Sequence, residues 1–377
     1  MSDFPRWTVD LCDDNFGRLH EVSAGSFSGV SRLNAAGQWR VDMLLDEIRF
    51  EVIPDVSTVL VRDETSIKFA GVVSRLSDSS GGAVRTVSAS ERRLVFEGAD
   101  LWGLLASRVV FPDPSTFDMS SEAFDVQSGV ASTVAAHFIS QNAGSGALVE
   151  RRFPGLSVSD PMVGVSATWA GRLQPLDVFV GQICDQGDIS CEADLDFQLD
   201  PRFTLREPVD RSNSIVFSDE GDLADFSQSW VPAGASWVLA AGQGEGAARD
   251  FESAGTPVGR ARVERVTEQS NATTSAQLSA IAEAVRRDEG AVTTIQGAIS
   301  EQVARQFPAN DAYRLGDLVG FNIGDVRIPV KVTSITTEVS ASRSVQLPVF
   351  GVWTPDRLQG LRRDVLGLAD RFNTQVK

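Results

Sequence analysis

Pairs of acidic residues at short spacing are the first feature of this sequence that could do chemistry, as the two carboxylates of a glycosidase or as calcium ligands. The candidates are Asp13 with Asp14, Asp194 with Asp196, and Asp219 with Glu220. On an extended strand Glu192 would share a face with the second pair, so a cation could bind there. Because no glycine-punctuated calcium loop accompanies these residues, we interpret them as a solvated strand face and predict neither a metal site nor a catalytic carboxylate.

A nucleophilic enzyme of the usual kind would need a histidine base, and the chain has two histidines, His20 and His137. His137 lies beside the apolar stripe of a predicted helix, which is typical of a hydrogen-bonded structural histidine, and His20 lies in a turn-rich region. The three cysteines, Cys12, Cys184 and Cys191, lack the spacing of a zinc site and are odd in number. We therefore predict buried or half-buried thiols in a reducing compartment and no enzyme.

A glycine-rich run at 242–246 follows the apolar residues 238–241 and could be taken for a phosphate-binding loop. It lacks the Lys-Ser/Thr pair of such loops, and Glu245 would repel a phosphate. The residues that follow, 247–251, are typical of the return arm of a hairpin. We therefore predict a flexible β turn here and no bound cofactor.

Length and composition limit the remaining possibilities. A chain of 377 residues with 42% apolar residues predicts two to four globular domains. The net charge of −17 disfavours nucleic-acid binding by charge. We find no signal peptide and no long apolar run, so we expect synthesis in the cytoplasm and no membrane span. Seven tryptophans and 21 phenylalanines against one tyrosine favour core aromatics over a carbohydrate-binding cleft.

The elements that must position these residues begin with a β-rich segment, 1–98. Alternation of apolar and polar residues, as in 39–44, predicts a small antiparallel barrel or sandwich, which part of 209–235 could complete. At 94–114 an extended run ends, and Asp100 stands where a helix N-cap would stand before a short apolar helix. This stretch is the hinge between the first β unit and the next part of the chain.

Residues 99–208 predict an inserted α+β domain. The segments 128–142 and 176–186 carry apolar residues at helical spacing, whereas 189–199 alternates with a period of two and predicts a strand. We predict a short turn over 169–172. Two helices packed on a small sheet would bury faces that neither layer could bury alone.

From 209 to 353 the pattern returns to β, interrupted by a helix over 273–289. Because both β-rich parts have similar size, we predict two related barrels in one subunit. The end of the chain, 354–377, predicts a helix with a heptad-like apolar stripe, which needs a partner surface on its own subunit or on another. The stripe residues, which we predict as an assembly interface, are Leu358, Leu361, Val365, Leu368 and Phe372.

Four stretches resemble the minor tail proteins of long-tailed phages of actinobacteria, and through them the hub proteins of phage baseplates and tail tips. They are GADLWGLLASRVVFP (98–112), GVASTVAAHFISQNAG (129–144), WAGRLQPLDVFVGQICDQGDISCEADLDFQL (169–199) and VLAAGQGEGAARDF (238–251). The likeness runs from about Asp46 to Phe350 and includes no catalytic motif. It implies a homotrimer in which two tube-like antiparallel β-barrel domains per subunit form a ring of pseudo-sixfold symmetry. Many hubs continue into a peptidase or lysin domain, whereas here only the stretch after Pro355 remains.

We therefore predict a mainly β structural protein of a siphovirus virion, a tail-tip or baseplate hub that closes the tail tube. The resemblance implies contacts with the distal tail protein or tail tube, the tape-measure protein and tip, fibre or spike proteins. DNA would meet the protein only in transit through a lumen, and we expect the lumen-facing residues to be net acidic. The alternatives are a carbohydrate-binding adhesion module of the tail tip and a cell-wall glycoside hydrolase.

Overall fold

The computed structural model describes residues 7–23, 25–73, 85–88, 93–218, 221–231, 234–244, 246–256, 259–268, 274–289, 292–324, 326–341 and 343–351. The chain divides into two compact units, unit 1 (Met1–Asp225 with Gly297–Lys377) and unit 2 (Phe226–Gln296). The described residues are mainly β with five α-helices, and their sheets do not close into barrels. The mainly β class is thus confirmed, and the two tube-like barrels stay a prediction. Short 3-10 segments occur at Leu45–Glu47, Phe50–Asp55, Val149–Arg151, Gly246–Ala248 and Gly259–Ala261.

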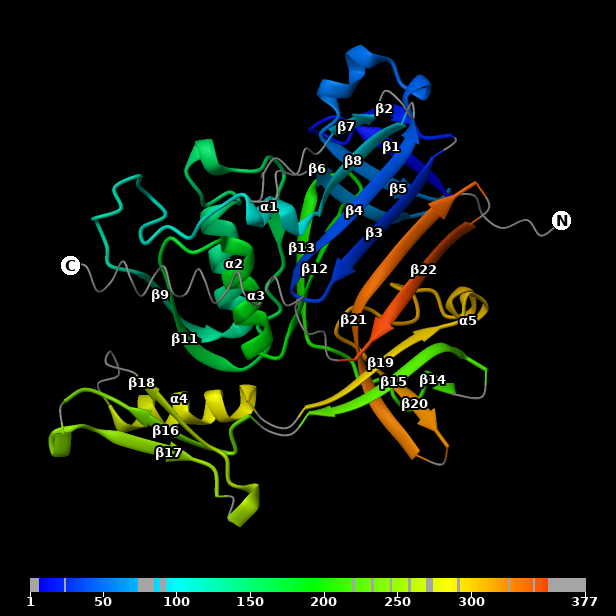
Figure 1. The fold of residues 1–377 in the computed structure, drawn as a ribbon. Helices are drawn as coiled ribbons and strands as arrows, with labels where there is room; N and C mark the ends of the chain where they lie inside the picture. The colour runs from blue at the N-terminus through cyan, green and yellow to red at the C-terminus, as the bar shows by residue number, and fades with distance from the viewer. Residues whose placement is uncertain are drawn as a thin grey trace. The chain divides into compact units, whose positions relative to one another are not determined.

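The first β region of unit 1 is an antiparallel sheet (Figure 1). In spatial order its strands are β3 (Ser26–Arg32), β4 (Ala35–Leu44), β8 (Arg93–Asp100), β6 (Ile67–Val73), β5 (Thr58–Arg62), β1 (Thr8–Cys12) and β2 (Arg18–Glu21), while β7 (Arg85–Ser88) also pairs with β8. The alternation in β4 buries Trp39, Val41 and Met43 and leaves Arg40 on the opposite face. The buried face packs into one apolar core with Phe27.

One long strand, β21 (Val326–Ser340), joins the two β regions of unit 1. Its first part pairs with β20 (Leu318–Ile323), and its later part pairs antiparallel with β3, with Val339 opposite Phe27. The side chain of Val339 joins the buried core of the first sheet. The strand that extends the first sheet therefore comes from the C-terminal part of the chain.

The second β region of unit 1 has an aromatic core. Its strands are β14 (Val216–Ser218), β20, β21 and β22 (Arg343–Phe350), with α5 (Glu301–Gln306) packed beside β22. Neighbouring rings in this core have centroids 5.0 to 6.4 Å apart, and the rings are those of Phe217, Phe307, Tyr313, Phe321 and Phe350. The chain leaves unit 1 along β15 (Leu223–Val231) and returns along β19 (Val292–Ile299).

An α+β insert lies in sequence between these two β regions. Its elements are α1 (Trp102–Ala106), β9 (Asp125–Val130), α2 (Ala131–Asn142), β10 (Ser157–Val158), β11 (Ser166–Gly171), α3 (Leu176–Gln186), β12 (Ser190–Leu195) and β13 (Pro201–Arg206). β10, β13 and β12 form one sheet, and β9 pairs with β11 in a two-stranded ribbon. α2 and α3 pack through Phe138 and Phe179, whose ring centroids are 4.8 Å apart. Both helices are confirmed, although α2 begins at Ala131 and not at Ser128, because residues 128–130 belong to β9. The predicted turn at 169–172 is wrong because Trp169 pairs with Gln127 inside the ribbon.

Unit 2 is a small sheet covered by one helix. The central strand β16 (Trp237–Ala241) pairs antiparallel with β17 (Phe251–Ala254) and parallel with β18 (Glu264–Glu268). The amphipathic helix α4 (Ser275–Asp288) lies within the predicted helix and packs Leu278 and Ala282 against the sheet.

Two predictions fall outside the described residues. These are the acidic pair Asp219 and Glu220 and the C-terminal stripe of Leu358, Leu361, Val365, Leu368 and Phe372. Among the helices that the structure describes, none has both the length and the apolar content that a membrane crossing requires.

Candidate functional site

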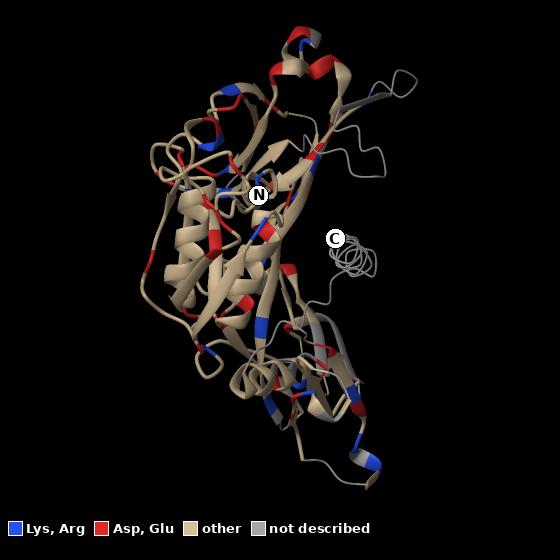
Figure 2. Cartoon of the chain, turned by 90° about the vertical axis from the view of Figure 1, so that its left-hand side faces the viewer, with Lys and Arg blue, Asp and Glu red and all other residues tan. Residues whose placement is uncertain are grey.

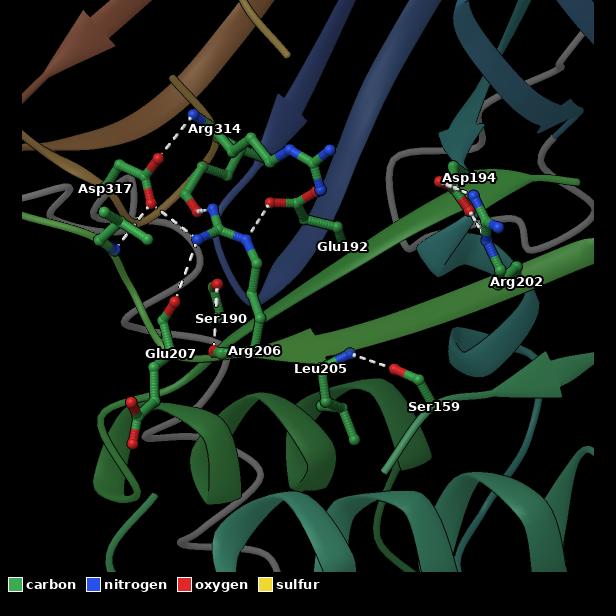
Figure 3. A network of polar contacts seen from close by, with 12 residues as sticks. Ser159, Ser190, Glu192, Asp194, Arg202, Leu205, Arg206, Glu207, Arg314 and Asp317 are labelled. Carbon is green, nitrogen blue, oxygen red and sulfur yellow. Dashed lines mark hydrogen bonds and ion pairs between the residues drawn. The ribbon is translucent and has the colours of Figure 1, made fainter. Parts of the chain in front are cut away.

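A network of charged side chains lies where the β12–β13 hairpin meets the second β region (Figure 3). Arg206, the last residue of β13, is its centre. The Arg206 guanidinium donates from Nη1 to Asp317 Oδ1 and from Nε to Glu192 Oε1, each at 2.7 Å, and from Nη2 to the Leu315 carbonyl oxygen at 2.7 Å. Only 16% of the Arg206 side chain is exposed, so these bonds replace most of its hydration.

Asp317 is the fully buried acceptor of this network. Besides Arg206, its carboxylate accepts hydrogen bonds from the backbone N–H of Val209 at 2.9 Å, the backbone N–H of Arg314 at 3.1 Å and Arg211 Nε at 3.2 Å. Burial by itself would raise the pKa of Asp317, but the bonds from Val209 and Arg206 outweigh it and hold the pKa below its ordinary value. The insert is thereby clamped to the second β region through a charged carboxylate.

Asn34 clamps the other side of the insert. It lies in the turn between β3 and β4 with a positive φ of 51°, a conformation that Asn tolerates better than most residues. Its buried amide donates from Nδ2 to Asp185 Oδ1 at 2.8 Å and to the Ile189 carbonyl oxygen at 2.9 Å, and its Oδ1 accepts the Cys191 N–H at 2.9 Å. One side chain thus holds the end of α3 and the start of β12 against the first sheet.

The acidic run of β12 is neutralised by arginines of β13. Glu192 bonds Arg206, and Asp194 makes a bidentate pair with Arg202 at 2.9 and 2.7 Å. Asp196 lies beyond the strand, in the hairpin turn. The three carboxylates therefore do not converge on a cation, and no group of three or more His, Cys, Asp or Glu among the described residues could hold a metal.

A cavity of about 420 Å³ adjoins this network. It lies between the first sheet, the β12–β13 hairpin and the loop before β20, and its lining includes Asp100, Arg32, Lys68 and Arg314. Asp100 ends β8 and accepts the Trp102 N–H at 3.1 Å, but the residue at the N-cap of α1 is Leu101 and not the predicted Asp100. Burial raises the pKa of the Asp100 carboxyl to about 7, although hydrogen bonds from Gly37 and Trp102 and the charge of Arg32 oppose this shift.

A comparison with protein families identifies the family of this chain. The family described as "Siphovirus ReqiPepy6 Gp37-like protein" matches residues 8–351 of the chain. The chain belongs to this family. The predicted resemblance to tail proteins of long-tailed phages is thereby confirmed. No curated protein matches the sequence.

Solved structures of tail proteins share the fold of the chain. The 43 kDa tail protein of prophage MuSo2 from Shewanella oneidensis has a TM-score of 0.60 at 10% identity, over 93% of this chain and 98% of that one. A tail protein from Neisseria meningitidis has a TM-score of 0.54 at 14% identity, over 92% and 97%. The prophage tail protein gp18 from Listeria monocytogenes has a TM-score of 0.53 at 8% identity, over 97% and 99%. At these identities the likeness shows the fold alone.

The histidines and cysteines occupy structural positions. His137 on α2 bonds Asp125 of β9 at 2.9 Å, which agrees with the predicted structural histidine. Burial lowers the pKa of His20. The cysteines Cys12, Cys184 and Cys191 are all buried and free, so the predicted buried thiols are confirmed.

The other predicted features are turns and core residues. Asp13 Oδ1 accepts the N–H groups of Asn15 and Gly17 within one turn. The glycine-rich run connects β16 to the antiparallel β17, so the predicted hairpin is confirmed. The tryptophans Trp39, Trp102 and Trp169 are buried, which does not favour a carbohydrate-binding cleft.

Sequence reasoning missed both clamps. Asn34 acts on residues more than 150 positions later, and Asp317 acts on an arginine 111 positions earlier. The available signals were weak: an Asn in a turn, and an isolated acidic residue between Leu315 and the apolar run of β20.

Proposed function

We propose that the chain is a structural protein of a phage tail tip or baseplate, a hub whose trimeric ring closes the tail tube and anchors tip, fibre or spike proteins. The observation that carries this proposal is that three tail proteins, two of them from prophages, match the fold over 97 to 99% of their own length. A match over whole chains argues for a shared architecture, whereas a match to one domain would allow any function.

The two clamps suit a protein that must withstand mechanical force. Asn34 and Arg206 fix the insert to both β regions with buried hydrogen bonds, so unit 1 resists shear between its parts. β21 adds a continuous strand through both β regions. In the proposed ring these β regions form the two tube-like barrels of each subunit.

The polar face of the first sheet suits a channel wall. Arg40 pairs with Glu97 across β4 and β8, Arg93 pairs with Asp42 at 2.8 Å, and Arg343 of β22 pairs with carboxylates of β21 and α5. An arginine already paired with a carboxylate binds phosphate weakly, so DNA would pass without being held. Figure 2 shows the described Lys and Arg at scattered positions along the ribbon, among Asp and Glu. We expect the lumen-facing residues of the ring to be net acidic, and a map of the ring with a basic lumen would contradict this.

Antibody-gold labelling of intact particles tests the location. We expect label confined to the distal end of the tail, where the tube meets the tip. Label along fibres would favour an adhesion module instead, and a chain absent from purified particles would refute the virion role. Turnover of labelled peptidoglycan by the pure chain would favour a cell-wall hydrolase.

Light scattering of the purified chain and its truncation tests the ring. We expect a particle of three times the chain mass, and loss of that mass in a chain truncated after Thr354 if the stripe from Leu358 to Phe372 contacts another subunit. Unchanged assembly of the truncated chain would remove the intersubunit role of this segment.

A further inference from the structure

The turn between β12 and β13 presents a bare aromatic ring to solvent. Phe197 stands at its tip and is 91% exposed, compared with 58% for Phe117 and 52% for Phe124. Phe117 also contacts the ring of Phe111 at 5.9 Å. Single exposed apolar residues are common on protein surfaces, so exposure alone decides nothing. Phe197 differs from the other exposed aromatic residues in the structure of the turn that carries it.

The turn is rigid. Asp196 Oδ1 accepts the N–H groups of Gln198 at 2.8 Å and Asp200 at 3.0 Å, and the Asp196 N–H donates to the Asp200 carbonyl oxygen at 3.0 Å. Leu199 adopts a left-handed conformation with φ of 65°, which costs energy for a residue other than Gly or Asn. The closing bonds hold the backbone of the turn in this conformation, so the direction of the Cα–Cβ bond of Phe197 is fixed.

The base of the turn is seated on the first β region. Leu195 is buried in a small apolar cluster with Cys12 and Leu101, and Leu199 packs against the same cluster. On the other side, Asp200 lies so close to Gly155 that a Cβ there would come within 2.0 Å of Asp200 Oδ1. The neighbours of Phe197 in the turn thus contact other parts of the chain, whereas the Phe197 ring itself contributes almost nothing to the stability of the fold.

We propose that Phe197 is an anchor that inserts into an apolar pocket, rimmed by Lys or Arg, on a different protein of the same particle. A rigid aromatic side chain loses little conformational freedom on binding, and such residues are typical of interface hot spots. Within the segment 194–202 Asp194 and Arg202 pair with each other, so Asp196 and Asp200 give the turn a net negative charge that a basic rim would complement. A second copy of this acidic chain, with its net charge of −17, complements it poorly. This inference rests on the proposed virion role.

Site-specific photo-crosslinking in cells that assemble the particle tests the partner. The chain carries p-benzoylphenylalanine in place of Phe197, and a matched chain carries it in place of Phe124. We expect a cross-link from position 197 to a different particle protein, mapped by mass spectrometry to apolar residues beside Lys or Arg. A cross-link to a second copy of this chain, or a yield no higher than from position 124, would overturn the proposal.

Complementation measures the contribution of the ring. We expect F197A to lower incorporation of the chain into particles about tenfold or more, as loss of a hot spot does, while F124A leaves it unchanged. The thermal midpoint of purified F197A should equal that of the wild type, because the ring packs against little in the chain. Normal incorporation of F197A would refute the anchor and leave the proposed function intact, whereas a wild-type chain absent from particles would refute the proposed function itself.

Discussion

Removal of the Asp317 carboxylate should destabilise unit 1 far more than removal of the surface carboxylate of Asp194 on the β12–β13 hairpin. Asp317 and Asp194 each pair with an arginine of β13 at 2.7 Å. They differ in burial, because the Asp317 side chain is fully buried and both partners of the Asp194–Arg202 pair are 47% exposed. The two variants D317A and D194A therefore compare one kind of contact in two environments.

The expected losses of unfolding free energy follow from the groups that each substitution leaves without a partner. D317A removes one of the acceptors of the largely buried Arg206 and leaves two backbone N–H groups, of Val209 and Arg314, without their acceptor. Breaking a buried pair from one side costs about 3 to 5 kcal/mol of unfolding free energy. D194A removes an exposed pair, which contributes about 1 kcal/mol or less. We expect a difference of at least about 2 kcal/mol between the variants.

Urea unfolding of the full chain, followed by tryptophan fluorescence, measures this difference. Trp102 is a suitable reporter because its ring lies 6.2 Å from that of Phe203 on β13. Since the pKa of Asp317 is lowered in the folded chain, its contribution is present above the ordinary Asp pKa and is lost as the pH falls through the folded value. The difference in unfolding free energy between the wild type and D317A should thus become smaller at acidic pH. Equal costs for D317A and D194A at neutral pH would refute the clamp.

Three further outcomes are expected. N34A should lower the unfolding free energy by about 3 kcal/mol or more, because it leaves buried groups such as the Cys191 N–H without their partner. N34G should cost about 1 kcal/mol less than N34A, because Gly adopts the positive φ of this position freely. Urea unfolding tests both variants, and equal costs would exclude a backbone contribution. Asp100 has a raised pKa, so its contribution to stability is complete below the ordinary Asp pKa and is lost as the pH rises through about 7. Thermal midpoints between pH 5 and 8 should therefore fall less for D100N than for the wild type, and parallel slopes would contradict the assignment. A thiol reagent should leave Cys12, Cys184 and Cys191 unmodified in the folded chain and modify all three in urea, whereas rapid modification of the folded chain would contradict their burial.

The parts of the fold that the sequence predicts well are those with strong local periodicity. α3 begins and ends where the apolar spacing of 176–186 places it. The alternation of 189–199 predicts β12, but the strand ends at Leu195 and residues 196–199 belong to the hairpin turn. The ribbon of β9 and β11 was not predicted because burial in β9 does not follow residue type. The polar Asp125 is buried whereas the apolar Val126 is 55% exposed, so the strand shows no apolar period of two.

The clamps could not be predicted from the sequence, because each is a long-range contact. Nothing near Asn34 indicates that Cys191 needs an acceptor for its N–H, and nothing near Asp317 indicates that Arg206 is buried beside it. Local patterns determine which residues face inward, whereas the partner of a buried polar group depends on how the elements are docked.

The polar character of both clamps bears on why unit 1 has one arrangement. An apolar junction between the insert and the β regions would exclude water as well, but apolar contact is non-directional and tolerates sliding. A displacement that separated Asn34 from Cys191, or Arg206 from Asp317, would leave buried donors and acceptors unpaired, and each unpaired group carries a penalty. β21 adds a similar penalty, because a slip of one residue against β3 would turn Val339 away from the core. The cost of misdocking is therefore spread over two clamps and one strand, which favours a single rigid geometry for unit 1 in each copy of the proposed ring.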